Sequence, residues 1–120
     1  MLKIEKLNQF YGESHTLWDL ELDVPQGQCT CVMGRNGVGK TTLMKCIMGE
    51  ETVKSGAIEF AQDVELTKKK IEDRSRLGIG YVPQGRRLWR SLTVDEHLRL
   101  VAAGHKGAWT VDRIYSTFPR

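Results

Sequence analysis

The sequence predicts an α/β fold, because a strand, a glycine-rich loop and a helix follow one another directly. Residues 28–33 form an extended, largely apolar run that suits a buried strand. The loop at 34–39 comes next, and residues 41–48 are rich in Leu, Met, Lys and Ile, as in a helix. Gly49 then stands where a helix C-cap is expected. This order places the backbone of the loop at a helix N-terminus.

Other segments predict the rest of the fold. Residues 2–7 and 18–24 alternate apolar and charged side chains, which is typical of half-buried strands in an antiparallel region. In the second of these strands we expect Trp18 to face inward together with Leu20, Leu22 and Val24. Residues 8–14 between the two strands are expected to form a loop that carries Phe10 and Tyr11.

The second half of the chain contains shorter signals. We expect a strand at 57–60, a charged helix at 67–76 with Thr67 as its N-cap, and a third core strand at 77–82. Thr93 and Glu96 match a capping box, which predicts a helix over 94–103. A last helical piece is expected over 110–117.

Size and composition fit a single soluble domain, residues 1–120. Hydrophobic residues make up 40% of the chain and charged residues 28%. No apolar run approaches the ~18 residues of a membrane span, and the N-terminus lacks the apolar core of a secretion signal. The formal charge of +3 is too small to indicate nucleic acid as a partner. We expect Cys29, Cys31 and Cys46 to be buried structural thiols, because no second Cys or His pair lies at zinc-ligand spacing.

The loop and the start of the helix fit the phosphate-binding pattern G-x-x-x-x-G-K-[ST]. Glycines let backbone N–H groups converge on an anion, and the helix N-terminus adds partial positive charge there. Lys40 is then expected to reach the β- and γ-phosphates, and the Thr41 hydroxyl to take one coordination position of Mg²⁺. The predicted nucleotide-binding residues are Gly34, Arg35, Asn36, Gly37, Val38, Gly39, Lys40, Thr41 and Thr42.

Together with this loop, Tyr11 and the segment Tyr81–Gln84 resemble the ATPases of ABC transporters. The resemblance extends over essentially the whole chain, since 55–58 and 92–98 also match family segments. It implies a P-loop NTPase (ABC ATPase) fold, N-terminal part: an antiparallel β region, the first strands of the RecA-like core and the start of the helical subdomain. It further implies that Tyr11 stacks on the adenine of ATP and that Gln84 contacts Mg²⁺ and the attacking water.

The resemblance also implies partners and a subfamily. The segments 34–42 and 78–87 resemble those of the ATP-binding subunits of urea and branched-chain amino-acid importers. Arg35 and Gln84 make the urea type the closer resemblance. In such a transporter a homologous ATPase subunit would complete the sandwich around ATP. The region Gly85–Leu92 would dock on the transmembrane permease subunits through an exposed Leu88–Trp89 pair, unless Trp89 is a core residue. The expected location is cytoplasmic, peripheral on the inner face of the cell membrane.

The family's later motifs do not occur in this sequence. These are the LSGGQ signature, the Walker B aspartate with its catalytic glutamate, and the switch histidine. No residue of this chain is therefore assigned a catalytic role, apart from water positioning by Gln84. We expect the 120-residue chain alone to bind nucleotide at most weakly and to hydrolyse it negligibly, although the complete protein would be an ATPase.

Three other interpretations stay open. One is a P-loop enzyme outside transport, such as a small-molecule kinase, although the joint placing of Tyr11, Lys40 and Gln84 argues against it. Another is a non-catalytic module that docks through residues 86–92 and senses nucleotide. The third is an ABC protein that acts in DNA repair or translation.

Overall fold

The computed structural model describes residues 1–35, 37, 39–85, 87–104 and 106–119. The chain divides into two compact units, Met1–Tyr81 and Val82–Arg120. Each unit is described by itself below. None of the described helices has both the length and the hydrophobicity that a bilayer-spanning segment needs.

The first unit is built on an antiparallel sheet with the strand order β2-β1-β3-β4. The strands are β1 (Leu2–Tyr11), β2 (Ser14–Val24), β3 (Ser55–Phe60) and β4 (Val64–Glu65). A tight turn at Gly12, where φ is +60°, joins β1 to β2. The loop predicted at 8–14 is therefore wrong, because the strand pairing continues to Tyr11 and Ser14 at the tip of this hairpin.

The register between β1 and β2 shifts by one residue at three places, and the second shift moves Trp18 out of the core. One extra residue is accommodated in β1, where Lys6 has a φ of +45°. The other two are accommodated in β2, the first of them where Asp19 has a φ of +37°. Leu17 is thereby buried, whereas Trp18 is 71% exposed, contrary to the prediction from simple alternation. Leu20 still packs against the core, in agreement with the prediction.

Side chains of Asn8 and its neighbours hold this irregular stretch of the sheet. The Asn8 amide donates to Lys6 O at 3.1 Å and to Asp19 Oδ1 at 2.9 Å. Its carbonyl oxygen accepts from the Asp19 N–H at 3.0 Å, and His15 Nε2 lies 2.9 Å from it. The His15 ring stacks between those of Phe10 and Trp18, with centroid distances of 4.0 and 3.7 Å.

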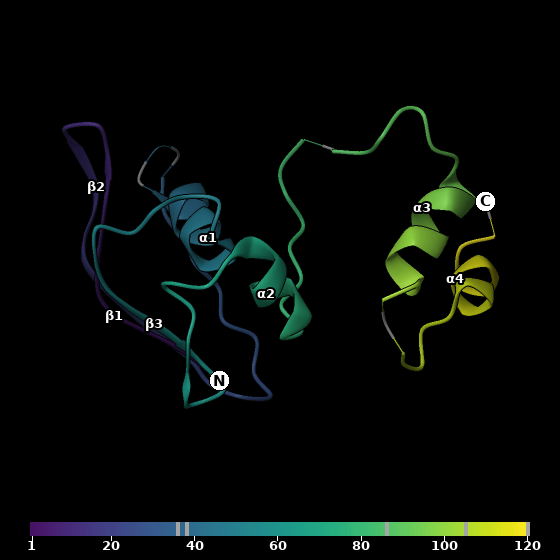
Figure 1. The fold of residues 1–120 in the computed structure, drawn as a ribbon, viewed down its shortest axis with the longest axis horizontal. Helices are drawn as coiled ribbons and strands as arrows, with labels where there is room; N and C mark the ends of the chain where they lie inside the picture. Colours follow the sequence, from purple (N-terminus) through teal and green to yellow (C-terminus); the bar gives the residue numbers. More distant parts are fainter. Residues whose placement is uncertain (36, 38, 86, 105, 120) are drawn as a thin grey trace. The chain divides into compact units, whose positions relative to one another are not determined.

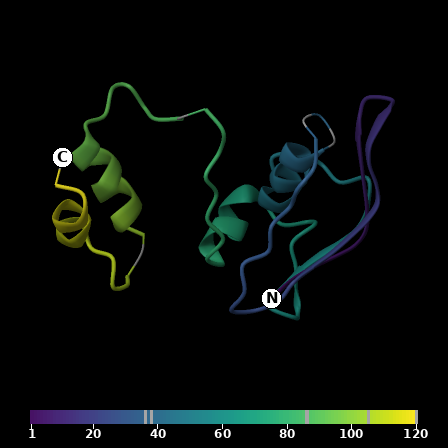
Figure 2. The same ribbon diagram turned by 180° about the vertical axis from the view of Figure 1, so that it is seen from behind.

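Helix α1 (Lys40–Met48) covers the sheet and supplies much of the core. It lies on the same side of the sheet as α2 (Ile71–Arg76) in both views of the ribbon (Figure 1 and Figure 2). Its end is set by Gly49, the predicted C-cap, which has a φ of +89° and donates to carbonyl groups of the last turn. The buried cluster consists of Ile4, Leu7, Leu17, Leu43, Cys46, Ile47, Ile58 and Leu66.

The two predicted core strands at 28–33 and 77–82 are not strands. An extended segment becomes a strand only through hydrogen bonds to a neighbour, and no described segment pairs with either stretch. Cys29 and Cys31 are exposed as a result, so only Cys46 is the buried thiol that was expected. Burial raises the Cys46 pKa to about 11, so this side chain stays a neutral thiol at physiological pH.

The charged helix starts later than predicted. Residues 67–70 precede α2, and Thr67 does not cap it. Instead, Thr67 Oγ1 accepts the backbone N–H of Ile58 at 2.9 Å and so extends the hydrogen bonding of β3. Hydroxyl side chains satisfy strand donors as readily as helix donors, which is why the sequence pattern misassigned this one.

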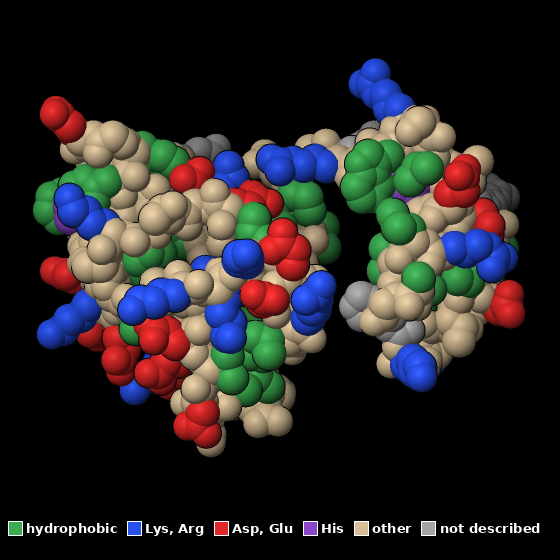
Figure 3. Space-filling model, viewed as in Figure 1, with side chains coloured by type: hydrophobic (Ala, Val, Ile, Leu, Met, Phe, Trp, Pro, Cys, Tyr) green, Lys and Arg blue, Asp and Glu red, His purple; other side chains and the backbone are tan. Residues whose placement is uncertain are grey.

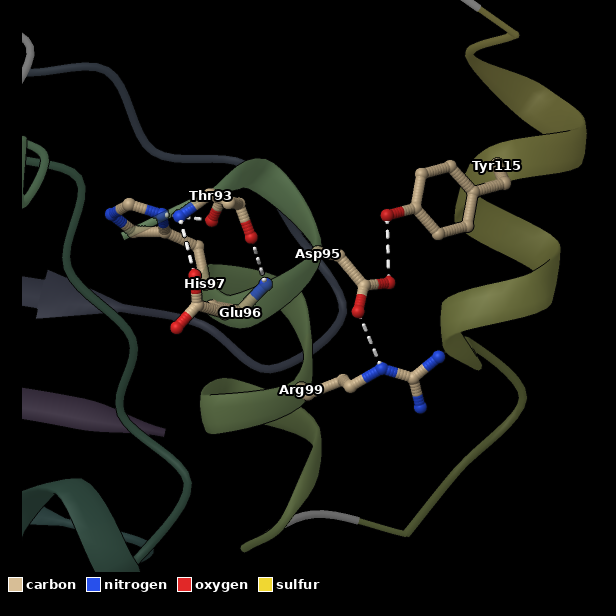
Figure 4. Close-up of polar contacts among 6 residues, drawn as sticks. All are labelled: Thr93, Asp95, Glu96, His97, Arg99 and Tyr115. Carbon is tan, nitrogen blue, oxygen red and sulfur yellow. Dashed lines mark hydrogen bonds and ion pairs between the residues drawn. The ribbon is translucent and has the colours of Figure 1, made fainter. Parts of the chain in front are cut away.

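The second unit holds α3 (Val94–Ala102) and α4 (Val111–Thr117). The capping box forms as predicted: Thr93 Oγ1 accepts from Glu96 N at 3.1 Å, and Glu96 Oε1 accepts from Thr93 N at 3.0 Å. Asp95 of α3 joins the two helices, because it accepts from Tyr115 Oη of α4 at 2.8 Å (Figure 4). Within α3, Asp95 also accepts from Arg99 Nε at 2.7 Å.

Hydrophobic side chains gather on the surface of the second unit (green in Figure 3). Leu88 is 71% exposed and Trp89 62%, so Trp89 is not a core residue. The Trp89 ring stacks on His97, whose Nε2 accepts the Trp89 N–H at 3.1 Å. The other ring nitrogen of His97 lies 2.7 Å from Thr93 O, so it carries the proton in this arrangement. Trp89 is thus held in place although it is exposed.

We predict that the contact between α3 and α4 weakens only in strong acid. The hydrogen bonds from Arg99 and Tyr115 lower the pKa of Asp95 below its usual 3.8. A carboxyl group with a lowered folded-state pKa stabilises the fold above its unfolded pKa and loses this effect as the pH falls through the lowered value. An NMR titration of the Asp95 carboxyl group checks this, and Arg99→Ala should raise its pKa more than Tyr115→Phe. A wild-type Asp95 that titrates at or above 3.8 would contradict the prediction.

Candidate nucleotide-binding site

The loop before α1 changes direction at glycines whose positive φ other residue types rarely adopt. Gly37 has a φ of +81° and Gly39, the N-cap of α1, a φ of +103°. A Cβ at Gly39 would lie 3.0 Å from Leu17 Cδ2 and 3.6 Å from Thr16 Cγ2. The positive φ of Gly39 strongly favours glycine, and the close approach to the Leu17 side chain leaves little room for a Cβ. The loop is in this way fixed against the sheet at the point where the helix begins.

The N-terminus of α1 is open to an anion. Gly39 provides no side-chain cap, and no acidic residue stands in the first turn of this fully described helix. By contrast, α3 has its capping box and two acidic residues in its first turn. Unpaired N–H groups and the positive end of the helix dipole make such a terminus favourable for phosphate.

Lys40 lies across the loop. Its Nζ donates a hydrogen bond to the carbonyl oxygen of Gly34, six residues earlier. The ammonium group is thus kept at the loop instead of extending into solvent. A phosphate in the loop would offer this cation a stronger, charged partner than a neutral carbonyl.

Tyr11 lies beside the same helix terminus. It ends β1 at the tip of the hairpin, is 43% exposed, and its Oη lies 3.2 Å from Thr42 Oγ1. Thr42 is buried in the first turn of α1. One hydrogen bond therefore joins two predicted nucleotide-binding residues that are 31 positions apart in the sequence.

The remaining predicted residues are exposed or lie outside the described part of the chain. Gly34, Arg35 and Thr41 are exposed. Asn36 and Val38 of the loop, and Arg86 of the docking region, lie outside the described residues. Gln84 is exposed in the second unit, and its role toward Mg²⁺ and water stays a prediction.

The donor groups at the loop fit Mg²⁺ only together with phosphate. Among the described residues, no group of three or more His, Cys, Asp or Glu side chains is arranged to hold a metal ion. Mg²⁺ typically keeps several waters and binds substrate phosphates with few protein ligands, so an exposed Thr41 hydroxyl at the helix N-terminus suits it.

Sequence reasoning missed Arg74, which supports the opposite end of α1. Its side chain is only 4% exposed. Nη1 donates to Cys46 O at 2.7 Å and to Ile47 O at 2.9 Å, both in the last turn of α1. The remaining bonds are Nε to Lys69 O at 3.0 Å and Nη2 to Thr67 O at 3.3 Å. All four acceptors are backbone carbonyls, which every residue type has, so no sequence pattern predicts these contacts.

The sheet, the loop and α1 define the class: a P-loop nucleotide-binding fold. The chain belongs to the ABC transporter family, whose model matches residues 17–119. The solved "Structure of ATP binding subunit of ABC transporter" has a TM-score of 0.76 and 32% identity, covering 87% of this chain and 42% of that one. A dimeric bacterial ABC transporter cassette shares the fold at 22% identity and the same TM-score, covering 94% of this chain and 52% of that one. The predicted fold is thereby confirmed.

The curated relatives include transport proteins for several amino acids. "Probable branched-chain amino acid transport ATP-binding protein LivF" of Archaeoglobus fulgidus is 41% identical over 94% of this chain and 45% of that protein. "High-affinity branched-chain amino acid transport ATP-binding protein BraG" of Pseudomonas aeruginosa is 32% identical over 100% of this chain and 52% of that protein. "Glutamine transport ATP-binding protein GlnQ" of Geobacillus stearothermophilus is 34% identical over 83% of this chain and 41% of that protein. The chain thus spans about half the length of the curated relatives that it matches.

We predict that the contact between Tyr11 and Thr42 stabilises the fold before any nucleotide binds. A double-mutant cycle of Tyr11→Phe and Thr42→Val should give a coupling energy of about 1 kcal/mol, typical of a neutral hydrogen bond. Urea unfolding of the four proteins measures it. The matched control is Thr41→Val, because Thr41 is an exposed neighbour and should couple to Tyr11→Phe by about 0.3 kcal/mol at most. Equal coupling in the two cycles would refute the prediction.

Proposed function

We propose that this chain is the nucleotide-binding part of the ATP-binding subunit of an ABC importer, and that Mg-ATP binds at its phosphate loop. The observation that carries the proposal is the meeting of Tyr11 with Thr42 at the N-terminus of α1. A tyrosine ring and a phosphate loop at one helix end match the two ends of a nucleotide, base and polyphosphate.

Each residue of the loop then has a physical role. Gly37 and Gly39 let backbone N–H groups approach the β- and γ-phosphates, and Lys40 exchanges the Gly34 carbonyl for a phosphate oxygen. Thr41 supplies one oxygen to Mg²⁺. Tyr11 offers its exposed ring to adenine, and stacking of this kind is worth about 1–3 kcal/mol per base in nucleic-acid complexes.

Hydrolysis requires more than this loop. In-line attack on the γ-phosphate needs an oriented water and groups that stabilise the developing charge. We assign the orientation of the water to Gln84 and the remaining groups to the rest of the transporter, including a homologous ATPase subunit that closes over the bound ATP. Bound ATP, once hydrolysed, supplies the free energy for transport.

The second unit is the proposed docking element. Leu88 and Trp89 are exposed in the region Gly85–Leu92, and the contact with His97 holds Trp89 in place. An exposed, oriented aromatic side chain flanked by arginines is typical of a protein interface. The proposed partner is the transmembrane permease, which would place the chain at the inner face of the cell membrane.

The proposed solute is a branched-chain amino acid. The names of two relatives support this choice, although others are named for glutamine, glutamate and arginine transport. Urea is the alternative, and it rests on Arg35 and Gln84 alone.

We predict that the chain binds Mg-ATP through Lys40 but does not turn it over. In an NMR titration, Lys40→Ala should weaken binding at least tenfold, because the loss of one charge-assisted contact to phosphate costs about 1.5–3 kcal/mol. Lys68→Ala, which removes an exposed lysine elsewhere in the first unit, should bind like the wild type. Equal binding by Lys40→Ala and the wild type would refute the site. Phosphate release well above that of Lys40→Ala would refute the claim that the chain alone is inactive.

We predict that loss of the protein reduces import of branched-chain amino acids. Cells that lack the gene should take up radiolabelled leucine more slowly than the parent, and uptake of urea should be unchanged. The opposite pattern would favour the urea alternative. Unchanged uptake of both, with nucleotide binding intact, would favour a nucleotide-sensing module or a P-loop protein outside transport.

A further inference from the structure

Arg74 is a buried charge that the nucleotide site does not use directly. Arginine is almost never fully buried unless its charge is balanced, yet no described carboxylate forms an ion pair with Arg74. Four of its five N–H groups instead donate to backbone carbonyls. Two of these carbonyls belong to the C-terminal turn of α1, where the partial negative charge of the helix lies.

The site around Arg74 is shaped for its guanidinium. A Cβ at Gly49 would lie 3.0 Å from Arg74 Nε and 3.1 Å from its Cζ. Gly49 is thus required twice, for the left-handed C-cap of α1 and for the approach of the arginine. The other two bonds, to Lys69 O and Thr67 O, tie the same guanidinium to the segment between β4 and α2. Arg74 therefore fixes the end of α1 to the rest of the first unit.

We infer that Arg74 is a positioning residue for phosphate binding: it anchors the C-terminus of α1 and thereby sets the position of the phosphate loop at the N-terminus. The inference rests on the proposed function, since it concerns the same nucleotide. α1 is only nine residues long, so a tilt at one end displaces the other. Its N-terminal end is held by the contact of Gly39 with Leu17 and by the bond from Tyr11 to Thr42. Arg74 supplies the second point that defines the helix axis.

The test compares two nucleotides that share adenosine but differ in phosphate. Arg74→Met should weaken Mg-ATP binding by about tenfold, because a displaced loop loses part of its charge-assisted hydrogen bonding to the phosphates. Binding of AMP, which lacks the β- and γ-phosphates, should change less than about twofold. Arg74→Lys should recover part of the ATP affinity, since an ammonium group can still donate to some of the carbonyls. NMR titrations of the 120-residue chain give both affinities, and circular dichroism gives the folded fraction.

A matched pair of glycine variants tests the contact without removing the arginine. Gly49→Ala and Gly78→Ala both force a residue with a Cβ into a positive φ, +89° and +97°. Only the first places a methyl group against the guanidinium, because a Cβ at Gly78 meets nothing within 4 Å among the described residues. Gly49→Ala should therefore weaken ATP binding severalfold more than Gly78→Ala. This pair and Arg74→Lys carry the test if Arg74→Met does not fold.

The outcomes separate this inference from the proposed function. A selective loss of ATP affinity in Arg74→Met and Gly49→Ala supports it. Equal losses for ATP and AMP that follow the folded fraction, or unchanged ATP affinity, overturn it while leaving the site intact. If the wild type binds no ATP, or Lys40→Ala binds it equally well, the proposed function itself fails and this inference fails with it.

Discussion

The structure of the first unit depends on the close packing of α1 against the antiparallel sheet. At Gly39, the N-cap of α1, the absence of a side chain lets the loop backbone approach β2. Leu17 lies so close to this glycine that a Cβ there would be 3.0 Å from Leu17 Cδ2, so the leucine side chain would have to shift. The same contact closes the core, because Leu17 belongs to the buried cluster together with Leu43 of α1. The hairpin and the phosphate loop thus share one packing contact, at Leu17. A loop that must hold its backbone N–H groups ready for an anion gains its rigidity from the hydrophobic core beside it.

The sequence predicted the helix ends correctly where they are determined by interactions between neighbouring residues. The helix after the loop ends at Gly49, and the second unit has its capping box at Thr93, because propensity and capping act within one turn. Both signals sit inside a few consecutive residues. The phosphate loop itself was recognisable for the same reason, since its glycines and Lys40 are consecutive or nearly so.

Features that depend on distant neighbours were predicted less well. Trp18 was assigned to the core because alternation assumes an unbroken register, whereas Asp19 adopts a positive φ that shifts the register of β2. Residues 28–33 have the composition of a buried strand, but a strand also needs a partner, and none is present among the described residues. Arg74 carries no sequence signal, because its partners are backbone groups that every residue type possesses.

The protonation state of Cys46 explains why the charge of Arg74 is balanced by backbone carbonyls of α1 and not by a side chain. Among the described residues, Cys46 is the ionisable side chain that raises the pKa of Arg74. Burial is the largest cause of the raised pKa of the thiol itself, which is about 11. It is therefore neutral at physiological pH and cannot balance the guanidinium as an anion. Burial lowers the pKa of Arg74, but from a value so high that the group stays charged. Its charge is then balanced by the carbonyl dipoles of α1. A cation at the C-terminus of α1 and an anion at its N-terminus would each interact favourably with the helix dipole.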